Sequence, residues 1–147
     1  MKRPTLLILA LLAVTTAGGA VVWDVHRLDR DFKLLFSLLG QARLDAFYRD
    51  TTVIVAFGDR IVTVSDDKGS RRVAAIPSLS DVDYDTTLGD DRIVYTWRGT
   101  AHHNRREHGG EILLKSLLGF KRYLHVNCNG LVRDGKYPRD AGRGKTG

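Results

Sequence analysis

The residues best suited to chemistry in this chain lie in one short polar segment, His102–His108, which reads HHNRREH. Its three imidazoles and the carboxylate of Glu107 are ligand types that zinc and copper accept. Arg105 and Arg106 stand in the same segment, however, and would repel a cation. Glycines on both sides indicate a flexible loop. We therefore predict a solvated or partner-facing loop here and no metal site.

A second candidate cation site is a group of aspartates between the predicted strands. Its members are Asp81, Asp83, Asp85, Asp90 and Asp91. They alternate or adjoin as the ligands of calcium loops do, but the glycine and the closing glutamate of an EF-hand are missing from the spacing. We predict a solvated acidic loop.

Cys128 is the only cysteine, which excludes an intramolecular disulfide and any site built from several cysteines. We expect a small, partly buried side chain beside a turn, with pairing to another chain or to a ligand as the alternative.

The chain has no sign of catalysis or of cofactor binding. No ordering of serine, histidine and aspartate and no pair of carboxylates stands out. The ending AGRGKTG resembles a phosphate-binding loop, but the first glycine of that motif would fall at Arg139 and no helix follows. We expect neither an enzyme nor a protein with a small-molecule substrate.

Positive charge is concentrated near the C-terminus. Residues 1–97 hold 12 Lys and Arg against 13 Asp and Glu, whereas residues 98–147 hold 11 against 4. This asymmetry favours contact with a polyanion or an acidic partner, although a merely solvated face explains it as well. The candidate contacts with DNA or another polyanion are Arg133, Lys136, Arg139, Arg143 and Lys145.

The elements that must position these residues begin with an apolar segment. No charged residue occurs from Pro4 to Trp23, and about 20 helical residues cover roughly 30 Å, the thickness of a bilayer's hydrocarbon core. Lys2 and Arg3 precede the segment, which predicts a cytoplasmic N-terminus and an extracytoplasmic domain. We favour a retained anchor, because Val21, Val22 and Trp23 extend the apolar run. A cleaved signal peptide with small residues at Gly18 and Ala20 is the alternative.

An amphipathic helix follows directly. Apolar residues recur at steps of three and four, as on one face of an α-helix that ends near Arg49 or Asp50. They are Val25, Leu28, Phe32, Leu35, Leu39, Ala42 and Ala46.

The periodicity then changes to two, which predicts strands. The expected strands are 52–57, 60–65, 71–76, 92–97, 111–117, 122–127 and 131–133, with a further short one near 82–84. No crossover helix separates them, so we predict an α+β domain in which the helix packs on a mainly antiparallel sheet of about seven short strands. The expected divisions are a transmembrane anchor or signal segment (1–23), the α+β domain (24–136) and a basic disordered tail (137–147).

Two stretches resemble the GspH/FimT group of minor pseudopilins and pilins. LLGQARLDAFYRDTTVIVAF is similar to the family's helix-to-strand motif, with Leu39, Ala42, Arg43, Ala46 and Arg49 in its places. GGEILLKSLLGFKRYLHVNCNGLVRDGK resembles the closing hairpin, which ends in a Gly-x-x-Arg pattern matched by Gly130 and Arg133.

The resemblance implies a non-enzymatic, pilin-like subunit of a type II secretion or type IV pilus assembly. It would sit in the inner membrane by a single pass, with its domain in the periplasm and other pilin-like subunits and the assembly machinery as partners. A DNA-binding minor pilin for DNA uptake and a periplasmic ligand-binding domain with a signal peptide remain alternatives. The chain departs from the family at its N-terminus, where no cleavage glycine is found and Ile8 stands at the place of the usual glutamate.

Overall fold

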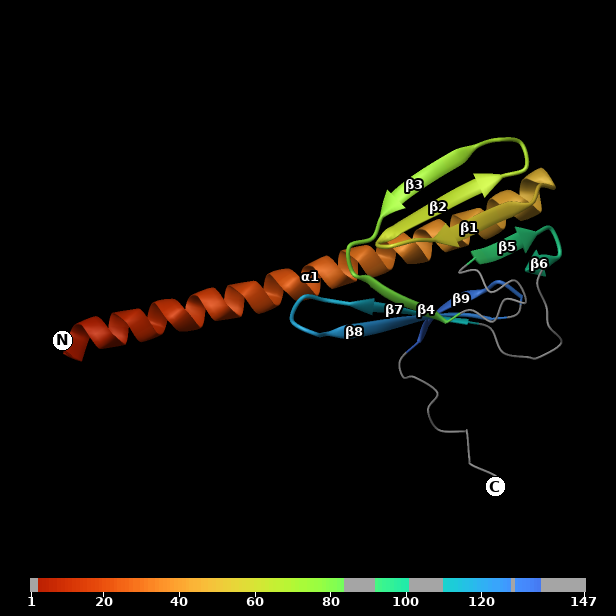
Figure 1. Ribbon diagram of the computed structural model, residues 1–147. Helices are drawn as coiled ribbons and strands as arrows, with labels where there is room; N and C mark the ends of the chain where they lie inside the picture. The colour runs from red at the N-terminus through yellow and green to blue at the C-terminus, as the bar shows by residue number, and fades with distance from the viewer. Residues whose placement is uncertain (1–2, 84–91, 101–109, 128, 136–147) are drawn as a thin grey trace, which may run out of the picture.

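The computed structural model describes the backbone of residues 3–83, 92–100, 110–127 and 129–135, and the side chains within these ranges except those of 3–15, 83, 99 and 100. The described chain forms one helix, α1 (Arg3–Arg49), followed by strands in two antiparallel sheets (Figure 1). The strands are β1 (Val53–Phe57), β2 (Ile61–Asp66), β3 (Arg71–Ala75), β4 (Leu79–Asp83), β5 (Arg92–Thr96), β6 (Gly99–Thr100), β7 (Gly110–Lys115), β8 (Lys121–Val126) and β9 (Val132–Gly135).

The strands divide into a five-stranded sheet of order β3-β2-β1-β5-β6 and a four-stranded sheet of order β4-β7-β8-β9. The predicted α+β class with one long helix is confirmed, but the prediction of a single sheet was wrong. Strand β4 begins earlier than expected, at Leu79, and β6 lies outside the expected strands. Alternation along a strand indicates which residues face the core. It does not indicate which strand pairs with which, so the sequence could not reveal the division.

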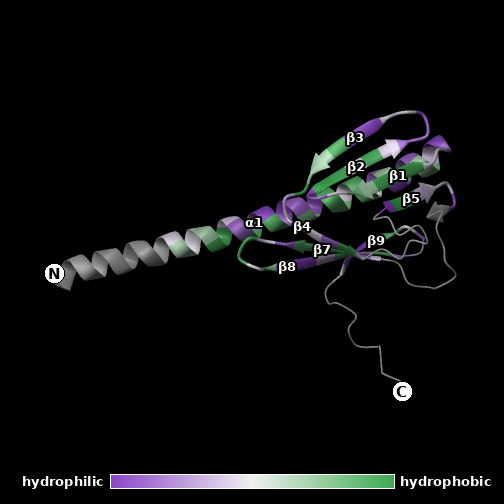
Figure 2. Cartoon of the chain, viewed as in Figure 1, coloured by the Kyte–Doolittle hydropathy of each residue, from purple (hydrophilic) through white to green (hydrophobic). Residues whose placement is uncertain are grey.

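The second half of α1 packs against both sheets. Leu28, Phe32, Leu35, Leu39, Ala42 and Ala46 are buried together with residues of both sheets, which confirms the predicted face. Val25 was expected on this face but is 43% exposed, since it lies to one side of the buried stripe. Figure 2 shows hydrophobic residues along β2 and β7, two of the strands that contribute to this core.

The pairing of β1 with β2 and β5 determines which side chains of the five-stranded sheet meet the helix. Val53 and Val55 of β1 are buried, and the register places Val55 opposite Val64 of β2 and Ile93 of β5. Alternate residues of three neighbouring strands therefore form one apolar surface, as the period of two predicts.

The N-terminal half of α1 extends beyond the β domain (Figure 1). Within the part of the chain with described side chains, which begins at Thr16, no helical stretch is long and apolar enough to span a membrane. Most of the predicted span, Pro4–Trp23, precedes Thr16 and lies outside the residues with described side chains. The membrane span therefore stays a prediction.

The helix ends where it was predicted to end. Asp50 adopts a left-handed conformation with φ of 47°, and the N–H of Thr51 donates to the carbonyl of Ala46 at 3.3 Å. This bond closes the last turn in the manner of a Schellman motif and turns the chain directly into β1.

Candidate functional site

The residues of the helix-to-strand motif divide into a buried and an exposed group. Leu39, Ala42 and Ala46 are at most 1% exposed and pack against the sheets. Arg43 is half-buried, and Arg49 is exposed and lies 3.8 Å from Asp45. Three motif residues thus serve the core, whereas Arg43 remains available to a ligand or a partner.

The end of the closing-hairpin stretch, which contains Gly130, forms the turn between β8 and β9. Gly130 has φ of +74° and its N–H donates to the carbonyl of Asn127 at 2.9 Å. The side chain of Asn127 accepts from the N–H groups of Asn129 at 3.0 Å and Leu131 at 2.8 Å. The positive φ explains why a glycine suits this turn.

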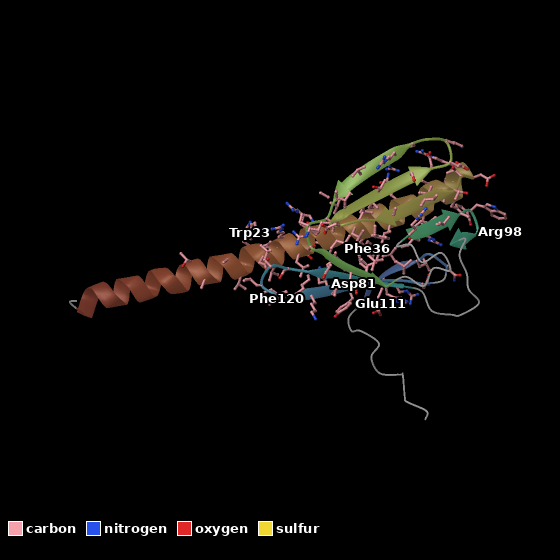
Figure 3. All side chains as sticks on the ribbon, viewed as in Figure 1. Trp23, Phe36, Asp81, Arg98, Glu111 and Phe120 are labelled. Atoms are coloured by element: carbon pink, nitrogen blue, oxygen red, sulfur yellow. The ribbon has the colours of Figure 1, made fainter. Side chains whose placement is uncertain are left out.

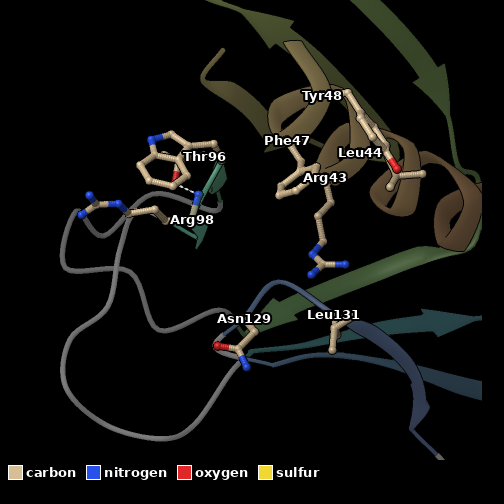
Figure 4. A pocket seen from close by; sticks show the side chains of 9 residues that line it. Arg43, Leu44, Phe47, Tyr48, Thr96, Arg98, Asn129 and Leu131 are labelled. Atoms are coloured by element: carbon tan, nitrogen blue, oxygen red, sulfur yellow. Dashed lines mark hydrogen bonds between the residues drawn. The ribbon is translucent and has the colours of Figure 1, made fainter. Parts of the chain in front are cut away.

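These two motifs meet at one groove near the C-terminal end of α1, which we call the helix-end groove. Its volume is about 500 Å³, and Figure 4 shows Arg43 pointing from the helix toward Asn129 and Leu131. It is lined by Arg43, Leu44, Phe47, Tyr48, Thr96, Trp97, Arg98, Asn129 and Leu131. Segments about 80 residues apart in the sequence therefore form a common surface.

The helix-end groove is aromatic and basic. Phe47 is 60% exposed and Tyr48 78% exposed, and the guanidinium of Arg98 lies 4.5 Å from the ring centre of Trp97. Arg98 lies at the opposite end of the domain from Trp23 (Figure 3). Among the described residues that line the groove none is acidic. Such a surface suits a partner that is acidic or that packs against aromatic rings, because arginine and exposed aromatic rings are typical of interaction hot spots.

Asp67, in the turn between β2 and β3, holds the helix-to-strand junction beside this groove. The hydroxyl of Thr51 and the N–H of Thr52 both donate to its carboxylate, the latter at 3.4 Å. The hydrogen bond from Thr51 is the main cause that lowers the pKa of Asp67 below its usual value, and the charge of Lys68 adds to it. The junction is therefore fixed by an ionised carboxylate.

Sequence reasoning missed two buried aspartates on the helix, Asp24 and Asp31, which are 2% and 1% exposed. Asp24 accepts from the N–H groups of Leu117 at 3.1 Å and Leu118 at 3.0 Å. Its pKa is lowered, first by a hydrogen bond from the Ser116 side chain. The sequence does indicate that these two aspartates are buried, because both fall on the helical stripe of Leu28 and Leu35. A charged residue on a buried stripe needs a specific partner.

Several predicted sites cannot be placed. His102–His108, Cys128, Lys136, Arg139, Arg143 and Lys145 lie outside the described residues. Arg133 is exposed on β9, and Asp81 is exposed on β4. Within the described ranges no group of three His, Cys, Asp or Glu residues is arranged to hold a metal ion.

Comparison of the chain with protein-family models, with curated proteins and with solved structures found no match to any of them.

Proposed function

We propose that this protein is a non-enzymatic, minor pseudopilin-like subunit of a type II secretion or type IV pilus assembly. Residues 4–23 would anchor it in the inner membrane, and its β domain would lie in the periplasm. One observation carries the proposal. A single unbroken helix extends beyond the domain with its first half and packs against two antiparallel sheets with its second half.

The helix-end groove supports a role in subunit contacts. The two motifs on which the family resemblance rests both contribute to it, through Arg43 on one side and Leu131 on the other. The exposed aromatic residues beside them give this surface the composition of a protein interface. We propose that a neighbouring pilin-like subunit occupies this groove.

The unusual N-terminus restricts the position of the subunit in an assembly. Ile8 stands at the place of the family's glutamate, so the chain lacks the carboxylate that would neutralise a neighbour's terminal amine. A subunit that caps or initiates a filament has no neighbour above it to neutralise. We therefore propose a terminal position.

Site-specific photo-crosslinking in native membranes tests the proposed partners. The crosslinker replaces Phe47 in the groove or, as a matched control, Val73 on β3; both side chains are 60% exposed. We expect pilin-like or secretion-system subunits to be captured from position 47 and not from position 73. Capture of no such subunit from position 47 would contradict the proposal.

A second candidate function is DNA binding, and the composition of the groove favours it. Phe47, Tyr48 and Trp97 offer stacking surfaces, Arg43 and Arg98 offer cations, and exposed Arg133 follows Leu131 by two residues on β9. Proteins that bind single-stranded nucleic acids combine these features.

A gel-shift titration with single-stranded DNA tests this candidate. We expect binding that weakens steeply with salt. The double variant Arg43→Gln, Arg98→Gln should reduce it. A second variant, in which residues 136–147 are removed and Arg133 is replaced by glutamine, should reduce it as well. Binding that neither change affects would exclude DNA contact through these residues.

A further inference from the structure

The turn between β7 and β8 is apolar, although turns at a protein surface are usually polar. We call Ser116–Phe120 the hairpin tip. Leu117 is 72% exposed, Leu118 55% and Phe120 44%, and Figure 2 shows this turn as hydrophobic. Exposed apolar side chains that cluster in this way mark a site of contact with another molecule or with a membrane.

The hairpin tip lies where α1 leaves the domain. Of the β domain, this turn reaches farthest toward the N-terminus (Figure 1). Figure 3 places Phe120 at about the same level along the helix as Trp23. The backbone of the tip is bound to Asp24, the first charged residue after the apolar N-terminal segment.

The backbone of the hairpin tip is prepared for an apolar environment. The N–H groups of Leu117 and Leu118 donate to Asp24, that of Gly119 to the Ser116 carbonyl at 3.2 Å, and that of Phe120 to the Ser116 hydroxyl at 3.0 Å. Four consecutive donors are thus paired within the chain. The usual cost of moving backbone out of water is that polar groups lose their hydrogen bonds. These four N–H groups would keep theirs if the tip left the water.

Two lysines border the hairpin tip. Lys115 and Lys121 are both exposed and face each other as register partners at the end of the hairpin. Like charges directly opposite each other destabilise a strand pair, and no described acidic side chain forms an ion pair with either lysine. A negatively charged surface would offset this repulsion, because it attracts both lysine side chains.

We propose that the hairpin tip is a second membrane contact, in which Leu117, Leu118 and Phe120 enter the interfacial region of the bilayer. Lys115 and Lys121 bind the phosphates of anionic lipid headgroups. This inference rests on the proposed anchoring through residues 4–23, which brings the tip to the membrane surface. Trp23, at the same level, is a residue type favoured at membrane interfaces.

The experiment uses the full-length protein in vesicles that contain phosphatidylglycerol. Cys128 is the only cysteine, so a Cys128→Ser background allows a polarity-sensitive fluorophore to be attached at Leu118→Cys. The matched control is Ser70→Cys in the turn between β2 and β3, at the far end of the domain (Figure 1). A quencher carried on the lipid headgroup region reports contact with the membrane, and vesicle flotation reports anchoring.

We expect blue-shifted emission and strong lipid-dependent quenching at position 118, with neither at position 70. Replacement of each lysine by glutamine should weaken insertion of the tip about fivefold at low salt. The proposal is overturned if the protein floats with vesicles while position 118 behaves like position 70. It is also overturned if position 118 is shielded but escapes the lipid-borne quencher, because another protein then covers the tip. Failure to float would overturn the anchoring as well.

Discussion

The buried carboxylate of Asp31 accepts both hydrogen bonds that Ser78 can donate, from its backbone N–H at 3.0 Å and from its hydroxyl at 2.8 Å. Ser78 lies in the connection between β3 and β4, where the chain leaves one sheet for the other. The helix therefore fixes the place at which the two sheets separate.

Asp31→Ala should lower the free energy of unfolding by about 2–3 kcal/mol, because it leaves two buried donors of Ser78 without an acceptor. Chemical denaturation of the full-length protein in detergent, followed by circular dichroism, measures the change. Asp59→Ala is the matched control, since the side chain of Asp59 is fully exposed. Equal stability of the two variants would contradict the proposed role of Asp31.

The lowered pKa of Asp67 predicts an acid-sensitive junction. Because the folded state holds this pKa below the unfolded value, the ionised carboxylate stabilises the fold above the unfolded pKa. That contribution is lost as the pH falls through the folded pKa. Thr51→Val removes the first cause of the shift, so the Asp67 pKa should rise in a carboxylate-resolved NMR titration. An unchanged pKa in this variant would contradict the assignment.

Ala46 is fully buried where α1 meets the sheets. Ala46→Leu should lower the free energy of unfolding by about 1–3 kcal/mol, because a larger side chain must push the helix away from the sheets or distort a rotamer. The control is Gln41→Leu, which adds an apolar side chain at an exposed position of the same helix. Denaturation midpoints distinguish the two, and an Ala46→Leu variant as stable as the control would show that the alanine is not needed for close packing.

Gly40 lies within α1, yet a Cβ atom placed on it would meet no described atom within 4 Å apart from its chain neighbours and the backbone of its own helical turns. Gly40→Ala should therefore stabilise the isolated protein by about 0.5–1 kcal/mol, because alanine favours the helix. If a partner's backbone approaches this face, the same variant should reduce crosslinking from position 47. A destabilised Gly40→Ala variant would indicate an intramolecular reason for the glycine.

Much of the fold could be predicted from local pattern. The spacing from Leu28 to Ala46 revealed the buried face of the helix, and the change of period after Asp50 revealed the start of β1. The division into two sheets could not be predicted, because it depends on contacts such as that of Asp31 with Ser78, which are 47 residues apart.

The candidate site was only partly predictable for the same reason. Arg43 and Gly130 were singled out by motif, but nothing in the sequence places Arg43 beside Asn129 and Leu131. The aromatic wall of the groove was missed because single exposed apolar residues such as Phe47 are common on protein surfaces and do not by themselves indicate a site.

The unbroken course of α1 from Arg3 to Arg49 has a mechanical consequence. At 1.5 Å per residue, the helix is a rod of about 70 Å, and its second half is fixed to both sheets. Rotation of the first half by even a few degrees would therefore swing the β domain through several ångströms. The helix acts as a lever arm that converts small changes of tilt at one end into displacement at the other.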